Sequence, residues 1–325
     1  MAYAIRVHKT GGPDALQYEE VEVGAPGAGQ VKLKQHAIGV NYIDVYIRTG
    51  LYPQPSSPFI VGSEGAGEVT AVGAGVTDLK VGDRVAYAGP AGGYASERLI
   101  PADRVVKMPD AIDYKTAAAM MLQGMTVQYL VRRTYKVVPG TVCLWHAAAG
   151  GVGLIASQWV KHLGGTLIGT AGGPEKCKLA LDHGAAHCID YTKDKDFVAK
   201  VKEITGGKMC DVVYDSIGKD TFPASLDCLK PLCLFVTFGN ASGPIEAFNP
   251  GILAAKGSLY LTRPSLAAYT ASRADLVATA NDLFDVVAKG AVKIKVNHTY
   301  ALKDAAQAHR DLEARKTTGS IVLVP

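Results

Sequence analysis

Hydrophobic positions along the chain follow two different patterns, and the change falls near residue 140. From residue 141 to about residue 263, short apolar runs alternate with longer stretches in which apolar residues recur every three or four positions. The short runs predict six strands: TVCLW, TLIGT, AHCID, CDVVYDS, CLFVTFG and SLYLTR. The longer stretches predict the intervening helices: GLIASQWVKHLG, PEKCKLALDHGA, KDFVAKVKEITG and TFPASLDCLK. This alternation predicts an α/β fold, a doubly wound six-stranded parallel sheet with helices on both faces.

The first part of the chain has a different character. Residues 3–110 contain short β-rich segments that glycine and proline interrupt. Such segments predict a twisted, partly closed antiparallel domain. They read AIRVH, LQYEEVEV, QVKLKQHAIGV, GEVTAVG, DRVAYA and ERLIPADRVVKMP.

After residue 264 the chain adds an amphipathic helix, a short strand, a second helix and a final strand, SIVLV. A strand that follows a completed six-stranded sheet has no place in that sheet, so we assign the tail to the first domain. The predicted domains are therefore residues 1–123 with 264–325, and residues 124–263. Ligands commonly bind where domains meet, so the cleft between the two domains is the expected site.

The composition indicates the cellular compartment of the protein more than it indicates the reaction. Six cysteines are scattered without a C-x-x-C pair, and a reducing, cytoplasmic compartment fits them best. The N-terminus lacks the layout of a signal peptide, and no apolar run reaches the roughly 18 residues of a membrane span. The net charge is +4 with dispersed basic residues, which counts against nucleic acid as a partner.

The turn HAAAGGVG (146–153) lies between a predicted strand and a predicted helix. Compared with G-x-G-x-x-G, it has Ala148 at the first glycine and keeps Gly150 and Gly153. The second glycine lets the backbone approach a pyrophosphate and the third lets helix and strand pack closely, whereas the first only eases the turn. The amide groups of Gly151 and Val152 would open the helix and face the phosphates. The turn therefore predicts a dinucleotide site.

The next strand ends in Thr170, followed by Gly172 and Gly173, where an NAD site would carry Asp or Glu for the ribose 2′-hydroxyl. A carboxylate there would repel a 2′-phosphate, so its absence favours NADPH. Lys176 at the start of the next helix and Tyr191 at the end of the third strand are candidate partners of that phosphate. A surface lysine is also often only solvated.

With these residues in view, the chain resembles the medium-chain dehydrogenase/reductase superfamily, and within it the zinc-free NADPH:quinone oxidoreductases, the zeta-crystallin-like proteins. The resemblance spans the whole chain. It rests on AIGVNYIDVYIRTGLYP (37–53), IVGSEGAGEVTAVGAGVTDLKVGDRV (60–85), GMTVQYL (124–130), AAAGGVG, YDSIG (214–218), FGN (238–240), LTRPS (261–265) and TTGSIVL (317–323). It implies a GroES-like β-rich catalytic domain joined to a Rossmann domain.

The zinc enzymes of that superfamily carry a cysteine in the stretch 42–44, a His-Glu pair at 63–64 and a four-cysteine lobe. Here the first 140 residues contain no cysteine, and His8, His36 and the dispersed carboxylates show no ligand spacing. We therefore expect no metal. Without a Lewis acid, reduction of an electron-poor acceptor fits better than oxidation of simple alcohols.

The resemblance assigns catalytic residues in the first domain and cofactor contacts in both. Asn41, Tyr46 and Tyr52 are the candidate catalytic residues, although Asn41 could be a turn residue and Tyr46 a core residue. We interpret Glu64 as structural, with Arg84 or backbone amides as partners, because a buried charge must be paired. The candidate cofactor-binding residues are Asn41, Asp44, Thr126, Gly150, Gly151, Val152, Gly153, Thr170, Gly172, Gly173, Lys176, Tyr191, Ser216, Phe238, Gly239, Asn240 and Arg263.

The last strand of the sheet, within residues 257–263, would leave a long exposed edge, and proteins usually pair or cover such edges. Pairing with a second copy would join two sheets, as in the dimers of the family, so a homodimer is expected. The predicted function is NADPH-dependent hydride transfer to a quinone or related conjugated carbonyl. Two alternatives remain open: an NADPH-dependent enone or enal reductase, and an NADPH-binding protein with a mainly RNA-binding or structural role.

Overall fold

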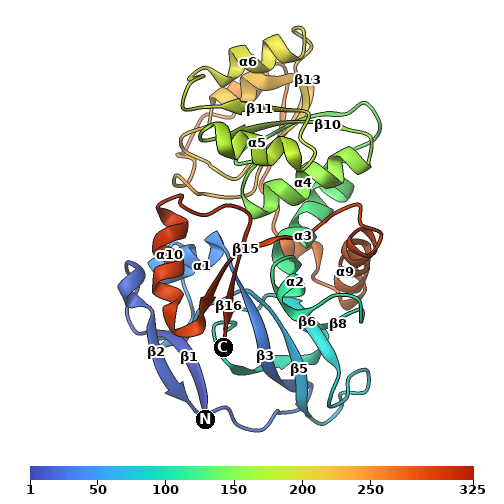
Figure 1. Cartoon of the computed structure of the whole chain (residues 1–325). Coiled ribbons are helices and arrows are strands. Elements are labelled where there is room, and N and C mark those ends of the chain that lie inside the picture. Colours follow the sequence, from blue (N-terminus) through green and yellow to red (C-terminus); the bar gives the residue numbers. More distant parts are fainter. The chain divides into compact units, whose positions relative to one another are not determined.

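A computed structural model describes all residues, 1–325, and divides the chain into two compact units (Figure 1). The first unit contains residues 1–125, 270–288 and 294–325, and the second contains residues 126–269 and 289–293. The sequence placed residues 264–269 in the first domain. In the structure they lie with the second unit, in which the Tyr269 ring stacks on Tyr129 at 4.5 Å and its hydroxyl accepts a hydrogen bond from Thr134.

The first unit is built on two sheets. Three antiparallel strands lie in the order β2 (Gln17–Val21), β1 (Ala2–Val7) and β4 (Phe59–Ile60). The larger sheet has the order β15 (Val296–Ala301), β16 (Ser320–Val324), β3 (Gln30–Val40), β5 (Glu64–Val72), β6 (Arg84–Ala88) and β8 (Val106–Lys107), and β7 (Glu97–Pro101) also pairs with β3. The C-terminal strand β16 runs antiparallel to β3, and Figure 1 shows the two side by side.

The long strand β3 serves two hydrophobic cores. Its first half alternates buried and less buried residues, and Val31 and Leu33 join the core with Val85. After a register shift at Gln35 its last four residues are all buried, and Ile38 joins a second core. The change from alternation to a continuous apolar run shows that cover lies on both faces there. The helices of this unit are α1 (Tyr42–Thr49), α2 (Tyr114–Ala118), α9 (Arg273–Ala288) and α10 (Ala305–Glu313), and α3 (Met121–Tyr129) continues into the second unit.

The second unit is the predicted parallel sheet. Its order is β11 (His187–Asp190), β10 (Thr166–Ala171), β9 (Val142–Trp145), β12 (Cys210–Asp215), β13 (Leu229–Thr237) and β14 (Tyr260–Thr262), with every pairing parallel. The chain leaves β9 toward one edge and returns to the other side of β9 with β12, so the crevice at which dinucleotides bind in such folds lies at the end of β9. The helices are α4 (Gly151–His162), α5 (Pro174–Asp182), α6 (Phe197–Ile204), α7 (Gly251–Ala255) and α8 (Leu266–Tyr269).

Two sequence expectations about this unit need correction. The stretch TFPASLDCLK forms only a 3-10 turn (Ala224–Cys228) instead of a helix. Pro223 lacks an amide donor, and the hydroxyls of Thr221 and Ser225 donate to the Asp215 carboxylate, which fixes the segment against the sheet. The edge strand β14 is also short, with three residues, although Tyr260 on it is 63% exposed.

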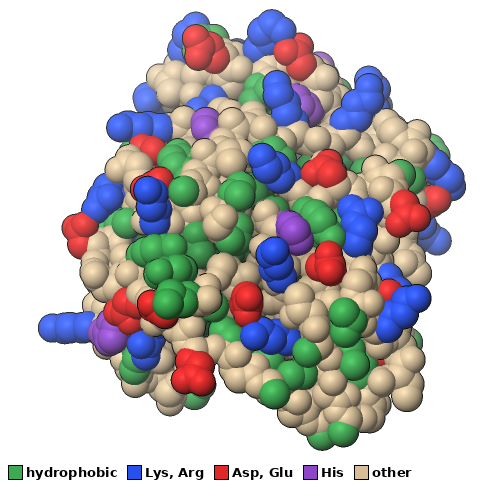
Figure 2. Space-filling view, turned by 60° about the horizontal axis from the view of Figure 1, so that its bottom comes forward, with side chains coloured by type: hydrophobic (Ala, Val, Ile, Leu, Met, Phe, Trp, Pro, Cys, Tyr) green, Lys and Arg blue, Asp and Glu red, His purple; other side chains and the backbone are tan.

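The surface carries both signs of charge. On the face shown in Figure 2, Lys and Arg side chains are interspersed with Asp and Glu side chains. None of the helices is both long enough and apolar enough to span a bilayer.

Candidate active site

The glycine turn follows β9 and caps helix α4. Gly150 is the N-cap of that helix, and Gly151 and Val152 begin it, all three partly exposed. At Gly153 a Cβ atom would lie 2.6 Å from the Ala147 carbonyl oxygen, so only glycine fits there. This end of the 12-residue helix therefore presents free amide groups and the positive end of its dipole.

The structure explains why alanine can replace the first glycine of the fingerprint. A Cβ atom at Gly169 on β10 would come within 2.5 Å of the Ala148 Cβ. Glycine at position 169 on the neighbouring strand therefore leaves room for the Ala148 methyl group. Ala147 takes the left-handed conformation, with φ of 56°. The departure at Ala148 is compatible with the same turn.

Thr170 lies near the end of β10, and its side chain is buried. Its side chain is 3% exposed, and its hydroxyl contacts His146 Nδ1 at 3.0 Å. On the other side His146 Nε2 contacts the Ser225 hydroxyl, which donates to Asp215. Burial lowers the pKa of His146. The Thr170 side chain is therefore engaged with His146 at the end of β10, and its contact with a cofactor stays a prediction.

The residues after Thr170 lie at the end of β10. Gly172 is close to Tyr191, whose hydroxyl oxygen would be 2.7 Å from a Cβ at this glycine. The Gly173 amide donates to the Asp190 carboxylate at 2.8 Å, which fixes the turn before α5. Lys176 lies in the first turn of α5 and is partly buried, while Tyr191 is 39% exposed. The predicted partners of the 2′-phosphate thus surround one strand end.

The loops after β12 and β13 touch each other. A Cβ atom at Gly239 would lie 2.5 Å from the Ser216 carbonyl oxygen, and the Phe238 amide donates to the Asp215 carbonyl. Asn240 is partly buried beside them, and Arg263 donates to the Thr237 carbonyl at the end of β13. These residues border the same carboxyl edge of the sheet as the glycine turn. Thr126, partly buried on α3, begins the second unit.

In the first unit, Asn41 precedes α1 and is held by two side chains. Its Nδ2 donates to Glu64 Oε1 at 2.6 Å, and its Oδ1 accepts from Gln123 Nε2 at 3.1 Å. The second Glu64 oxygen accepts from the Leu122 amide at 2.7 Å. Glu64 is fully buried, and burial raises its pKa to about 8. A backbone amide is therefore a partner of Glu64, whereas Arg84 donates instead to the carbonyls of residues 110 and 112.

Asp44 lies in a buried hydrogen-bonded position at the start of α1. It is fully buried, and its oxygens accept from the Asn41 amide, the Ser63 hydroxyl and the Tyr94 hydroxyl. Burial raises its pKa to about 6. Asp44 therefore fixes the start of α1 and, with it, the backbone of Asn41. A direct contact of Asp44 with the cofactor stays a prediction.

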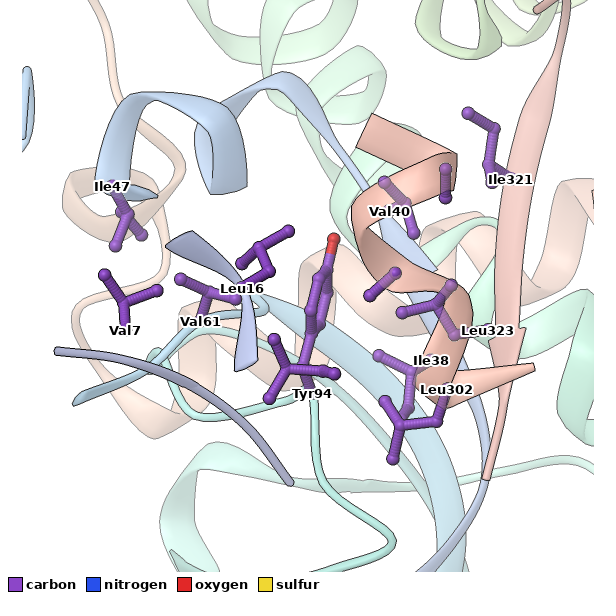
Figure 3. Packing of buried hydrophobic residues seen from close by; sticks show 13 residues of the cluster. Val7, Leu16, Ile38, Val40, Ile47, Val61, Tyr94, Leu302, Ile321 and Leu323 are labelled. Atoms are coloured by element: carbon purple, nitrogen blue, oxygen red, sulfur yellow. The ribbon is translucent and has the colours of Figure 1, made fainter. Parts of the chain in front are cut away.

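A hydrogen-bonded chain continues from Asp44 into the core. The Tyr94 hydroxyl contacts His309 Nε2 at 3.0 Å, and His309 Nδ1 contacts Arg48, which forms a bidentate pair with Glu313. Figure 3 shows Tyr94 within the apolar cluster, its hydroxyl pointing away from Leu302 and Ile38. Burial, with the nearby Arg48 charge, lowers the pKa of His309 to about 3. This neutral imidazole joins α10 to α1.

The predicted tyrosines form an aromatic group on α1 and just after it. Tyr46 and Tyr52 meet edge to face at 5.3 Å, and Tyr42 lies 6.2 Å from Tyr46. Tyr46 is 8% exposed, so most of its ring packs in the domain, while Tyr52 is more accessible. Sequence reasoning missed Gln123, Tyr94 and His309, because no local motif marks residues that reach Asn41 or α1 from 50 to 261 positions away.

The residues present do not form a zinc centre. Nowhere in the chain do three His, Cys, Asp or Glu side chains come together as a metal site. At the positions of the zinc ligands, the Ser63 hydroxyl is committed to Asp44 and the Glu64 oxygens to Asn41 and Leu122.

A Rossmann-type parallel sheet joined to a β-rich unit of this topology defines a dehydrogenase or reductase of the medium-chain type. Family models agree: residues 27–110 match the alcohol dehydrogenase GroES-like domain, and residues 151–276 match a domain described as zinc-binding dehydrogenase. The chain belongs to the quinone oxidoreductase family of the medium-chain dehydrogenase/reductase superfamily. The predicted fold class and family are thereby confirmed.

Three relatives illustrate the similarity. The quinone oxidoreductase of Pseudomonas aeruginosa is 52% identical, with both chains covered completely. The crystal structure of Escherichia coli quinone oxidoreductase complexed with NADPH has a TM-score of 0.98 and 49% identity, covering 99% of this chain and 100% of that one. A 2-haloacrylate reductase from a Burkholderia species is 47% identical, over 100% of this chain and 99% of its own.

Proposed function

We propose that this protein uses NADPH to reduce quinones by hydride transfer, without a metal. The observation that carries the proposal is the glycine turn at the end of β9: Gly150 caps α4, and Gly153 is confined by the Ala147 carbonyl. A pyrophosphate on this helix N-terminus would accept hydrogen bonds from the free amides of the first turn. The similar E. coli quinone oxidoreductase, crystallised with NADPH, supports the choice of cofactor.

The remaining cofactor contacts follow the edge of the sheet. Lys176 and Tyr191 would contact the 2′-phosphate, and Ser216, Phe238, Gly239, Asn240 and Arg263 would border the nicotinamide end. NADPH, when bound, supplies the hydride, and the protein contributes orientation and exclusion of water. From the first unit, Asn41 would hold the carboxamide or the acceptor, since its amide keeps one N–H and one lone pair beyond the bonds to Glu64 and Gln123.

The tyrosines are the candidate acceptor-binding groups. Tyr52, partly exposed and packed against Tyr46, would stack on a planar acceptor, and its hydroxyl would donate a proton to the reduced quinone. Neither Asp44 nor Glu64 is needed as an acid, because a hydroquinone also takes protons from water.

A second candidate function is reduction of a conjugated alkene. The 47% identity to a 2-haloacrylate reductase favours it, and hydride transfer to an enone needs the same cofactor geometry. We also propose a homodimer through the edge strand, residues 257–263, where Tyr260 and, on the neighbouring strand β13, Leu232 expose 63% and 67% of their surfaces. The six free cysteines favour work in a reducing, cytoplasmic compartment.

Steady-state oxidation of NADPH and NADH with a panel of acceptors tests the proposal. The panel contains 1,4-benzoquinone, 9,10-phenanthrenequinone, a simple enone and a 2-haloacrylate. Turnover with the quinones and NADPH, unchanged by a metal chelator, is the expected result. Turnover with the alkenes alone would replace quinone reduction by the second candidate, and preference for NADH would overturn the cofactor assignment.

A further inference from the structure

The side chain of Asn41 belongs to a buried row of four hydrogen-bonding groups. Glu64 Oε1 lies 2.6 Å from Asn41 Nδ2, Asn41 Oδ1 lies 3.1 Å from Gln123 Nε2, and Gln123 Oε1 lies 2.9 Å from the Ser320 hydroxyl. The row ends at the Ala119 carbonyl, 3.0 Å from the same hydroxyl. The four side chains are between 0% and 9% exposed. Water therefore has little access to replace any of these bonds.

With Glu64 ionised, the row holds one conflict. A carboxylate only accepts, so Asn41 must donate to Glu64 and Gln123 must donate to Asn41. Ser320 then has one proton and two acceptors, Gln123 Oε1 and the Ala119 carbonyl. One of these oxygens receives no proton from Ser320.

With Glu64 protonated, reversing both amides removes the conflict. The Glu64 hydroxyl donates to Asn41 Oδ1, Asn41 Nδ2 to Gln123 Oε1, Gln123 Nε2 to the Ser320 oxygen, and Ser320 to the Ala119 carbonyl. The oxygen and nitrogen of an amide occupy nearly the same space, so the heavy atoms keep their places. The 2.6 Å separation of Glu64 and Asn41 also suits an O–H···O bond better than an N–H···O bond.

The surroundings of Glu64 favour the neutral acid. Glu64 pairs with Gly39 of β3 and Ala88 of β6 and receives the Leu122 amide from α3. Its titratable neighbours are the Asp44 carboxyl on α1 and the phenols of Tyr87 and Tyr94. The guanidiniums nearby are engaged elsewhere: Arg98 lies over the Tyr87 ring, and Arg48 contacts His309 and Glu313. Burial and the Asp44 charge both raise the pKa of Glu64.

We propose that Glu64, Gln123 and Ser320 are positioning residues that set the orientation of the Asn41 amide, and that protonation of Glu64 reverses both amides together. The reversal exchanges the positions of the N–H and the oxygen lone pair of Asn41 that are not bonded to Glu64 or Gln123. Its effect on the reaction rests on the proposed function, in which Asn41 faces the cofactor or the acceptor. When Glu64 ionises, its proton passes to solvent.

The experiment is a pH titration of the cofactor-free protein by NMR, with ¹³C-carboxyl glutamate and ¹⁵N side-chain amides, from about pH 6 to about pH 10. We expect the Glu64 carboxyl and the amide signals of Asn41 and Gln123 to change with one shared midpoint. In the Glu64→Gln variant the introduced side-chain amide donates to Asn41 at every pH, so the shared step should disappear. Glu68→Gln on the same strand, whose side chain is partly exposed, is the matched control and should keep the step.

Ser320→Ala removes the acceptor that Gln123 needs in the protonated state, so it should lower the Glu64 midpoint by about one pH unit. Amide signals that stay constant while Glu64 titrates, or a Glu64 midpoint that Ser320→Ala leaves unchanged, would overturn the proposal. The pH dependence of KM for NADPH distinguishes failure of the Glu64 switch from failure of the proposed function. A coupled NMR step without a step in KM would leave the switch standing and overturn the role of Asn41 in the proposed function.

Discussion

Single residues in this protein take their roles from their surroundings. Asp44 and Thr170 both lie next to residues of the candidate site, but both are buried and bonded to their own domain. Lys176 and Tyr191, in contrast, lie at a strand end where the backbone carries two consecutive glycines, Gly172 and Gly173. At this scale the NADPH assignment depends on the groups that meet a phosphate there.

Replacement of Lys176 by alanine tests that assignment. A charge-assisted contact with the 2′-phosphate contributes about 1.5 to 3 kcal/mol, so Lys176→Ala should weaken NADPH binding by roughly tenfold to a hundredfold. NADH binding should change little. Calorimetric titration with both nucleotides measures this, and Lys178→Ala, in the same helix and ion-paired with Asp182, is the control. Equal losses for both nucleotides would contradict the assignment.

At the scale of elements, the fit between β9, its turn and β10 decides whether the dinucleotide site forms. Ala148 fills the space that Gly169 leaves open, and Gly153 lets α4 start against the turn. The motif is therefore distributed over two strands. A substitution at Gly169 should lower the stability of this unit, and a second substitution at Ala148 should restore it.

Gly169→Ala should reduce the stability of the second unit by about 1 to 3 kcal/mol, because the two Cβ atoms would overlap. Ala148→Gly in the same chain should recover most of that loss. Both tryptophans, Trp145 on β9 and Trp159 on α4, belong to this unit, so urea unfolding followed by tryptophan fluorescence reports on it. A double variant no more stable than Gly169→Ala alone would show that the two positions are not coupled.

At the scale of the whole molecule, buried titratable groups determine how stability depends on pH. The folded pKa of Glu64 is raised to about 8, so the folded state binds the proton more tightly than the unfolded state, and stability falls as pH rises toward that value. Asp44, raised to about 6, acts in the same direction at lower pH. His309, lowered to about 3, acts oppositely, but only below its unfolded value of about 6.5.

Between about pH 6.5 and about pH 8, Glu64 is thus the only one of these three groups that is protonated in the folded state and ionised in the unfolded state. The first unit should lose about 1.4 kcal/mol of stability per pH unit in this window, and Glu64→Gln should flatten the slope. Hydrogen exchange of amides in β3 and β5 measures it, with Glu68→Gln as the control. An equal slope in Glu64→Gln would place the pH dependence on another group.

The proposed dimer is a property of the same scale. A lysine at Tyr260 would place like charges opposite each other if two β14 strands pair, so Tyr260→Lys should convert the dimer to monomer. Sedimentation equilibrium measures the mass, and Tyr18→Lys, an exposed tyrosine on β2 of the other unit, is the control. A monomeric parent protein would contradict the proposal directly.

The sequence by itself determined the doubly wound sheet, because alternating apolar runs and helical periods are local signals that a parallel sheet requires. It also determined the glycine turn and the chemical character of the candidate site, since the residues that the backbone of that turn requires are consecutive in the sequence. It overestimated the helix at TFPASLDCLK and the length of the last strand, where contacts of Asp215 and the sheet edge prevail over local pattern.

Only the tertiary structure decided which polar residues surround Asn41 and which withdraw into the core. Gln123, near the start of α3, contacts Asn41, and Ser320, at the start of β16, contacts Gln123. Nothing in the local sequence of either residue marks this contact. Thr170 and Asp44 turned inward for the complementary reason: buried hydrogen-bond partners, distant in the chain, satisfied them there. Hydrogen bonding between residues far apart in sequence depends on the fold, which a pattern of neighbouring residues does not contain.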